Sequence, residues 1–254
     1  MNAPITNHYD PENAAELMKF AAAAYDRNRE LQIENFQLSI IDSATTDTRA
    51  VIYQTEQDII VAFRGTRSLR NFVTDIRARR VPLFAGSEAE VHEGFQCALN
   101  SVCDALLSSV EEMAGGPATP RLWITGHSLG AALAKLFAIR CKLAIAGVYT
   151  FGEPRVGNAA FRDYYNALLK SCTFRVVDGE DFITRIPWLL ALYRHSGTEI
   201  FYDSFCRVLI DPPWWTKAPS DVFGAWQEYH AGHRLALLAD HHVSRYEEIL
   251  NSKC

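Results

Sequence analysis

The chain has 254 residues, of which 48% are hydrophobic and 22% charged, so it is long enough to bury the core of one sizeable globular domain. A formal net charge of −5 offers no basic footprint for a polyanion, which argues against a nucleic-acid partner. No apolar run approaches the roughly 20 residues that span a bilayer, and the first residues lack the basic and apolar stretches of a secretory signal.

The first half of the hydrophobic pattern predicts a helix followed by a meander of strands. Asp10 and Pro11 have the residue types of a helix cap and first turn, and apolar residues then recur at helical spacing as far as Tyr25. Three β-rich runs separated by short polar turns follow, at residues 36–41, 50–54 and 59–63.

From residue 91 the pattern alternates between helices and strands. Helices are expected at residues 91–113, 131–141 and 159–169, and strands at residues 122–125, 148–151 and 173–177. Such alternation predicts an α/β fold whose central sheet is mostly parallel, with helices on both faces and antiparallel N-terminal strands. Two further strands are expected at residues 199–202 and 206–210, with a closing helix around Tyr246. No repeat or linker interrupts the pattern, so we expect residues 1–254 to form a single domain.

The motif Gly-His-Ser-Leu-Gly at residues 126–130 points to a nucleophile. It follows an apolar strand and opens a helix. A strand-to-helix turn this tight strains the serine backbone and exposes the hydroxyl, while the flanking glycines let strand and helix approach. The alternative is a glycine-bounded turn in which Ser128 only caps the helix. The flanking strand and helix favour a nucleophilic Ser128.

Several motifs in the same order resemble those of the class 3 lipases, the family of fungal triacylglycerol lipases and their relatives. Besides residues 126–130, the motifs lie at residues 61–66, 71–75, 91–95, 151–158 and 175–177. The resemblance covers residues 50–202, resumes at 240–250, and implies an α/β-hydrolase fold with ester hydrolysis. Residues 203–239 match no part of it.

The resemblance also implies the acid and the base that a nucleophilic serine requires. The chain order in this fold is serine, acid, histidine. The family's acid stands a few residues after Arg-Val-Val, which matches Asp181, with Asp178 as the alternative. The base precedes the last helix, where the spacing favours His241 over its neighbour His242. Phe182 departs from the family pattern, because relatives often carry proline there.

Three other histidines are expected to have no catalytic role. His195 resembles a structural histidine that recurs in the family between the acid and the base. His230 and His233 are spaced as H-x-x-H, but no carboxylate or thiolate cluster of ligand spacing accompanies them, so surface positions are expected rather than zinc. The chemistry requires neither a metal nor an organic cofactor.

The remaining site expectations concern the oxyanion and the substrate. The Leu129 N–H follows the nucleophile, and the residue after Arg-Gly in the family, here Thr66, is expected to supply the second donor. Apolar residues at helical spacing resemble a lid helix near residues 67–80, the alternative being an ordinary surface helix. The expected substrate-binding side chains are Leu69, Phe72, Val73, Trp188 and Leu189.

Together these features predict a lipase or carboxylesterase that acts on lipid esters and makes transient contact with a lipid interface. Phospholipase A1, thioesterase and feruloyl-type esterase activities would use the same residues, and a non-catalytic lipid-binding scaffold is the alternative outside the enzymes. Six cysteines without CxxC spacing indicate free buried thiols, which suit a reducing compartment, so we expect a cytoplasmic protein. Export without a signal peptide and the oligomeric state stay open.

Overall fold

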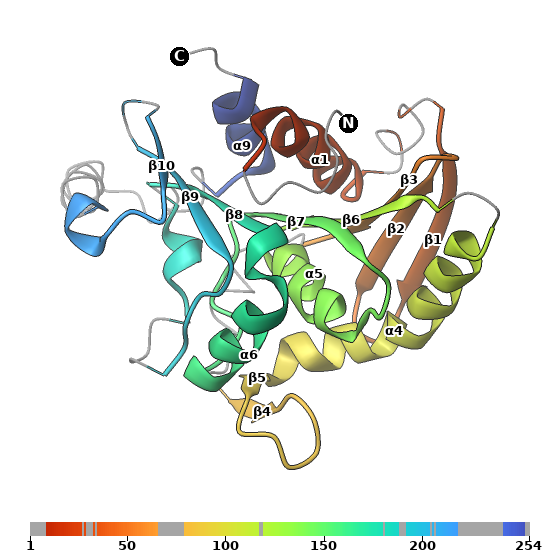
Figure 1. The fold of residues 1–254 in the computed structure, drawn as a ribbon, viewed down its shortest axis with the longest axis horizontal. Coiled ribbons are helices and arrows are strands. Elements are labelled where there is room, and N and C mark those ends of the chain that lie inside the picture. Colours follow the sequence, from red (N-terminus) through yellow and green to blue (C-terminus); the bar gives the residue numbers. More distant parts are fainter. Residues whose placement is uncertain are drawn as a thin grey trace.

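The computed structural model describes residues 9–26, 28, 33, 35–65, 79–116, 119–179, 181–187, 192–203, 205, 207–217 and 241–251. Within this part of the chain, eight strands form one sheet in the order β1-β2-β3-β6-β7-β8-β9-β10, and helices cover both of its faces (Figure 1). Two further strands, β4 and β5, pair in a small second sheet.

The sheet begins antiparallel and continues parallel. Its strands are β1 (Gln37–Ser43), β2 (Thr48–Gln54), β3 (Asp58–Phe63), β6 (Arg121–His127), β7 (Ile145–Phe151), β8 (Thr173–Asp178), β9 (Thr198–Tyr202) and β10 (Val208–Ile210). The first three form the expected meander, β3, β6, β7, β8 and β9 run parallel, and β10 returns antiparallel on β9. The predicted mostly parallel sheet is therefore confirmed.

Five α-helices and two 3₁₀ turns are described. The helices are α1 (Pro11–Ala23), α4 (Glu93–Ala114), α5 (Leu129–Arg140), α6 (Ala159–Leu169) and α9 (Val243–Asn251), and the turns are η1 (Lys170–Cys172) and η2 (Phe182–Arg185). The Asp10 carboxylate caps α1 by accepting from the backbone N–H groups of Glu12 and Asn13. None of the described helices combines the length and apolar character that a bilayer crossing demands.

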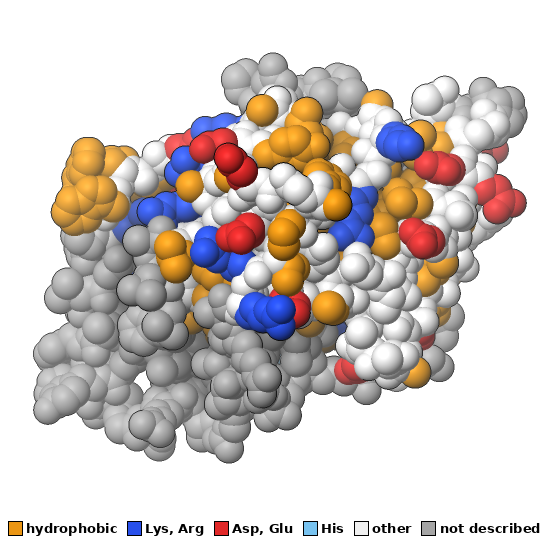
Figure 2. Space-filling view, turned by 90° about the horizontal axis from the view of Figure 1, so that it is seen from below, with side chains coloured by type: hydrophobic (Ala, Val, Ile, Leu, Met, Phe, Trp, Pro, Cys, Tyr) orange, Lys and Arg blue, Asp and Glu red, His pale blue; other side chains and the backbone are white. Residues whose placement is uncertain are grey.

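Two apolar cores lie on the two faces of the sheet. Alternate residues of a strand point to opposite faces, so Val61 packs into the core that holds α4 and α5, whereas Ile60 packs into the core that holds α1 and α9. Residues 130–138 of α5 are completely or almost completely buried, because α5 packs against β3, β6 and β7 and also against α4. On the face that carries α4 and α6, acidic, basic and apolar side chains are mixed (Figure 2).

Two boundaries differ from the sequence expectations. Residues 90–92 form strand β5 (Glu90–His92), which pairs with β4 (Arg80–Pro82), so α4 begins at Glu93 instead of residue 91. The His92 N–H donates to the Val156 carbonyl, a contact from outside the helix that sequence periodicity does not reveal. Since Arg80 belongs to a strand, a lid helix near residues 67–80 would have to end before it, and residues 66–78 lie outside the described part.

Candidate active site

Ser128 occupies the turn between β6 and α5 in a strained backbone conformation. Its φ of 60° and ψ of −127° lie where residues with a side chain are rare. The Ser128 N–H donates to the Phe151 carbonyl at 3.0 Å, which ties the turn to the end of β7. The side chain makes no capping hydrogen bond to α5. The geometry therefore does not match the helix-cap alternative, and the hydroxyl is buried where the sequence motif predicted an exposed one.

Two glycines make this turn possible. A Cβ at Gly126 would overlap the backbone of Gly130, and a Cβ at Gly130 would overlap the carbonyl of Phe63 at the end of β3. The G-x-S-x-G spacing thus lets β3, β6 and α5 meet at one point. Leu129 is the first residue of α5, so its N–H belongs to the first turn, where a helix offers no internal acceptor.

The predicted acid and base are in direct contact. The Nδ1 atom of His241 lies 2.7 Å from Oδ2 of Asp181, and both side chains are completely buried. The Tyr246 hydroxyl donates to the same Oδ2 at 2.6 Å, and the Ile183 N–H donates to Oδ1 at 2.9 Å. Burial and the Asp181 charge raise the pKa of Tyr246 well above its usual value, so its hydroxyl stays a donor. The carboxylate is held from three directions.

The two alternatives have different partners. Asp178 forms an ion pair with Arg245, with 2.8 Å between Oδ2 and Nε, at the start of α9. The His242 ring is exposed, and its Nδ1 lies 3.1 Å from the Ser244 hydroxyl oxygen. Both contacts hold the beginning of α9 in place, so the geometry favours Asp181 and His241 for the chemistry.

Gly152 connects the serine turn to the acid and base. It follows Phe151, has a φ of 57°, and a Cβ there would lie 2.7 Å from Cε1 of His241 and 2.9 Å from Oδ2 of Asp181. Ser128 Oγ and His241 Nε2 are both buried and have no hydrogen-bond partner among the described residues. These two atoms are the ones that a proton transfer from serine to histidine uses.

His127 is a site residue that the sequence argument did not identify. Its ring stacks on the ring of His241, with 4.6 Å between centroids and 31° between planes, and its Nδ1 lies 3.0 Å from the Tyr25 hydroxyl. Burial, followed by the charge of His241, holds the pKa of His127 well below its usual value. An uncharged ring therefore lies against the imidazole of His241. The motif placed His127 beside the serine, but only the fold brings it against residue 241.

Of the predicted site residues, Asp181 and His241 are in direct contact, and Ser128 and Leu129 lie in the turn that is tied to Phe151, the neighbour of Gly152. The other predicted residues lie outside the described part of the chain, namely Thr66, Leu69, Phe72, Val73, Trp188 and Leu189. His230 and His233 lie outside it as well, and the described residues contain no group of three or more His, Cys, Asp or Glu side chains placed to hold a metal ion.

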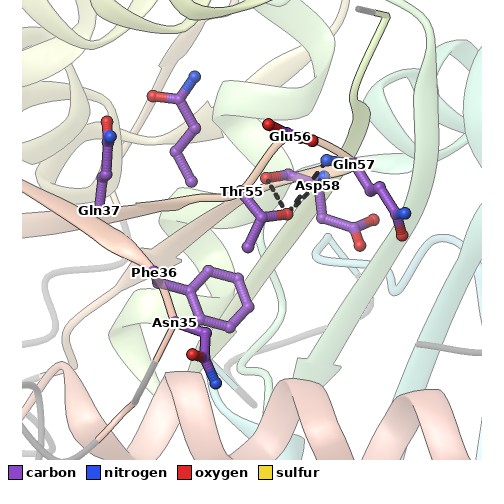
Figure 3. Close-up of a pocket in the computed structure, with 8 residues that line it drawn as sticks. Asn35, Phe36, Gln37, Thr55, Glu56, Gln57 and Asp58 are labelled. Atoms are coloured by element: carbon purple, nitrogen blue, oxygen red, sulfur yellow. Dashed lines mark hydrogen bonds between the residues drawn. The ribbon is translucent and has the colours of Figure 1, made fainter.

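A separate cavity of about 740 Å³ lies at the far end of β3 and is lined by residues 35–37 and 54–58 (Figure 3). There the Thr55 hydroxyl oxygen accepts from the Asp58 N–H at 3.0 Å. The Asp58 carboxylate accepts from Arg121 and from the Trp123 indole, each at 2.8 Å. With its carboxylate so engaged, Asp58 is a structural residue, and the cavity contains none of the predicted catalytic side chains.

Comparison with known proteins identifies the family of the chain. Residues 60–190, just over half of the chain, match the family described as Lipase (class 3). A secreted mono- and diacylglycerol lipase 1 of Fusarium solani is 32% identical over 151 residues, covering 58% of this chain and 44% of the relative. A secreted mono- and diacylglycerol lipase A of Penicillium cyclopium is 34% identical over 170 residues, covering 64% and 54%. The chain thus spans about half the length of the curated relatives it matches.

Solved structures show the same fold. A Rhizomucor miehei lipase–propeptide complex aligns with a TM-score of 0.70 at 23% identity, over 79% of this chain and 69% of that one. A lipase from Rhizopus microsporus var. chinensis aligns with a TM-score of 0.67 at 28% identity, over 78% of both chains.

The expectation of a cytoplasmic protein is wrong, because the relatives from Fusarium, Penicillium and Malassezia are named as secreted lipases. The four cysteines in the described residues are indeed free, but one of them, Cys97, is exposed. A few unpaired thiols therefore do not identify a reducing compartment. By its sequence match and by the arrangement of its sheet and serine turn, the chain belongs to the class 3 lipase family and has the α/β-hydrolase fold.

Proposed function

We propose that the protein hydrolyses carboxylic esters of lipids through a covalent acyl-enzyme, with Ser128 as nucleophile, His241 as base and Asp181 as the acid that orients it. The observation that carries this proposal is the buried contact between Asp181 and His241, next to a serine in a strained turn. Family membership supports the same chemistry.

The reaction takes two steps. His241 Nε2 accepts the proton of the Ser128 hydroxyl as Oγ attacks the ester carbonyl, and the resulting imidazolium donates that proton to the departing alcohol. Asp181 accepts from Nδ1–H throughout, which fixes the tautomer and stabilises the positive ring. Water then attacks the acyl-enzyme, again with His241 as base. The Leu129 N–H, with Thr66 as second donor, stabilises the oxyanion in both steps.

The proposal also covers the substrate, the lid and the location of the protein. Since the relatives are named as mono- and diacylglycerol lipases, glycerides are the proposed substrates. We propose a single domain over residues 1–254, with a lid helix between Thr66 and Arg79 whose apolar side chains contact a lipid interface. The acyl chain would lie against Leu69, Phe72, Val73, Trp188 and Leu189. The proposed setting is extracellular, as for the secreted relatives.

A fluorophosphonate probe tests the nucleophile, because it reacts covalently with an activated serine. We expect labelling of the wild type and of Ser108→Ala, which removes an exposed hydroxyl on α4, and no labelling of Ser128→Ala. Labelling of Ser128→Ala at the wild-type rate would place the nucleophile elsewhere. A folded wild-type protein that stays unlabelled would instead be a non-catalytic scaffold.

A further inference from the structure

A second cavity, of about 190 Å³, lies between β8, β9 and the turn η2. Its charged lining consists of Arg155, Arg175, Arg185, Glu199 and Lys217. Neither Ser128 nor His241 contributes to it. We propose that this cavity binds a phosphate group, either free or as a phosphomonoester, a proposal that stands apart from the proposed ester hydrolysis.

One carboxylate in this cavity forms ion pairs with two cations. Arg175 Nη2 and Lys217 Nζ lie 3.1 Å and 3.0 Å from Oε2 of Glu199. Arg175 is only 4% exposed, and its Nε has no hydrogen-bond partner among the described residues. A buried guanidinium donor left without an acceptor is costly, so the site favours an additional oxygen ligand.

Arg155 and Arg185 add positive charge on the side of η2. Arg155 donates to the carbonyls of Arg185 and Pro187, which are neutral acceptors. Arg185 donates to the carbonyl of Gly179 at 3.1 Å. Burial, followed by the charges of Arg175, Arg194 and Arg185, lowers the pKa of Arg155. Four cations and one carboxylate thus give the described lining a clear positive excess.

His195, the titratable neutral residue of the lining, adds no charge to the cavity at neutral pH. His195 also lines the cavity, and its Nε2 donates to the Thr184 carbonyl at 2.7 Å. Burial and the Arg175 charge lower the pKa of His195 to about 4, so the ring is uncharged at pH 7. The arginines, Lys217 and Glu199 therefore set the charge of the described lining.

The size and donor type identify the ligand class. At about 30 Å³ per water in the liquid, the cavity has the volume of roughly six waters. This is enough for a phosphate with some hydration. Guanidinium groups present several N–H donors in one plane and match oxyanions, and the excess of positive charge favours a dianion over a monocarboxylate.

The cavity wall is continuous with the loop that carries Asp181. Thr184 lines the cavity, and its hydroxyl donates to the Asp181 carbonyl at 2.7 Å. Arg185 and Gly179 lie on the same loop and also line the cavity. A bound phosphate would therefore link β9 to this loop and stabilise it.

Isothermal titration of the full chain with inorganic phosphate, at constant ionic strength held by NaCl, tests the proposal. Lys217→Met and Arg155→Gln each remove one positive charge from the lining. Lys142→Met removes one from an exposed position between α5 and β7 and is the matched control. We expect saturable one-to-one binding to the wild type and the control, and at least tenfold weaker binding, about 1.4 kcal/mol, to both cavity variants. Circular dichroism melting checks that each variant is folded.

Titration with glycerol 3-phosphate and with acetate identifies the ligand further. Phosphate binding alone supports a free phosphate as ligand, and equal binding of glycerol 3-phosphate supports a phosphomonoester. The proposal is overturned if the wild type shows no saturable binding up to millimolar phosphate, if all variants bind phosphate equally, or if acetate binds as tightly as phosphate. Fluorophosphonate labelling by Ser128 is read separately, so either proposal can fail alone.

Discussion

Gly152→Ala measures how tightly the backbone confines the acid and the base. A Cβ at this position would lie 2.7 Å from Cε1 of His241, whereas two carbon atoms in contact are about 3.5 Å apart. The imidazole must therefore move by roughly 0.8 Å, and a misplacement of about 1 Å costs on the order of 10²-fold in rate. The same Cβ would lie 2.9 Å from Oδ2 of Asp181, and Nδ1 of His241 is already 2.7 Å from that oxygen, so the imidazole cannot relieve the contact by moving toward its partner.

A control variant separates the effect of backbone strain at Gly152 from the effect of its contacts with His241 and Asp181. Gly152 has a φ of 57°, and a side chain there costs about 1–2 kcal/mol of stability. Gly86 has a φ of 77°, and a Cβ added there would meet no atom within 4 Å. Gly86→Ala thus carries comparable backbone strain without touching the site.

The assay is kcat/KM for p-nitrophenyl butyrate, alongside thermal melting. We expect Gly152→Ala to lose at least as much stability as Gly86→Ala, because its Cβ also meets His241 and Asp181, and Gly152→Ala alone to lose about 10²-fold in kcat/KM. If kcat/KM of the two variants agrees within threefold, the packing of Gly152 against the acid and base does not govern the rate.

Further substitutions test the choice between Asp181 and Asp178, the choice between His241 and His242, and the pKa of His195. Asp181→Asn is expected to lower kcat by about 10⁴, while Asp178→Asn affects melting more than rate, and the reverse pattern in p-nitrophenyl butyrate kinetics would exchange their roles. His241→Ala should abolish hydrolysis and His242→Ala should leave kcat within a few-fold of wild type, because the second ring is exposed. The pKa of His195 is about 4 in the folded chain, against the usual 6.5. Between these pH values the ring of His195 therefore binds a proton in the unfolded chain but not in the folded chain. Stability should therefore fall as the pH drops from 6.5 to 4, by up to about 3 kcal/mol, and urea melts of His195→Gln should show a shallower fall.

The sequence predicted the elements whose signals are local. Apolar periodicity located the strands and helices of the sheet to within a few residues, and the family motifs singled out the acid and base that the structure places in contact. The roles of His127 and Gly152 depend on contacts with residue 241, far along the chain, which no local pattern reports. Strand β5 escaped notice because its three residues continue the apolar pattern of the helix that follows, although they pair with the nearby strand β4. The roles of Thr66 and the lid helix remain predictions.

The packing of α1 against α9 has a consequence for inactivation. α9 begins two residues after His241, and its Tyr246 and Ile249 are buried in the core that α1 covers. Tyr25, just beyond the end of α1, bonds to His127, whose ring supports the base. The base is therefore held by two helices that close over one face of the sheet (Figure 1). Local opening of such a helix pair requires less free energy than unfolding of the central strands. We expect warming to inactivate the protein before the sheet melts, with amide exchange in residues 243–251 rising at the temperature at which activity is lost.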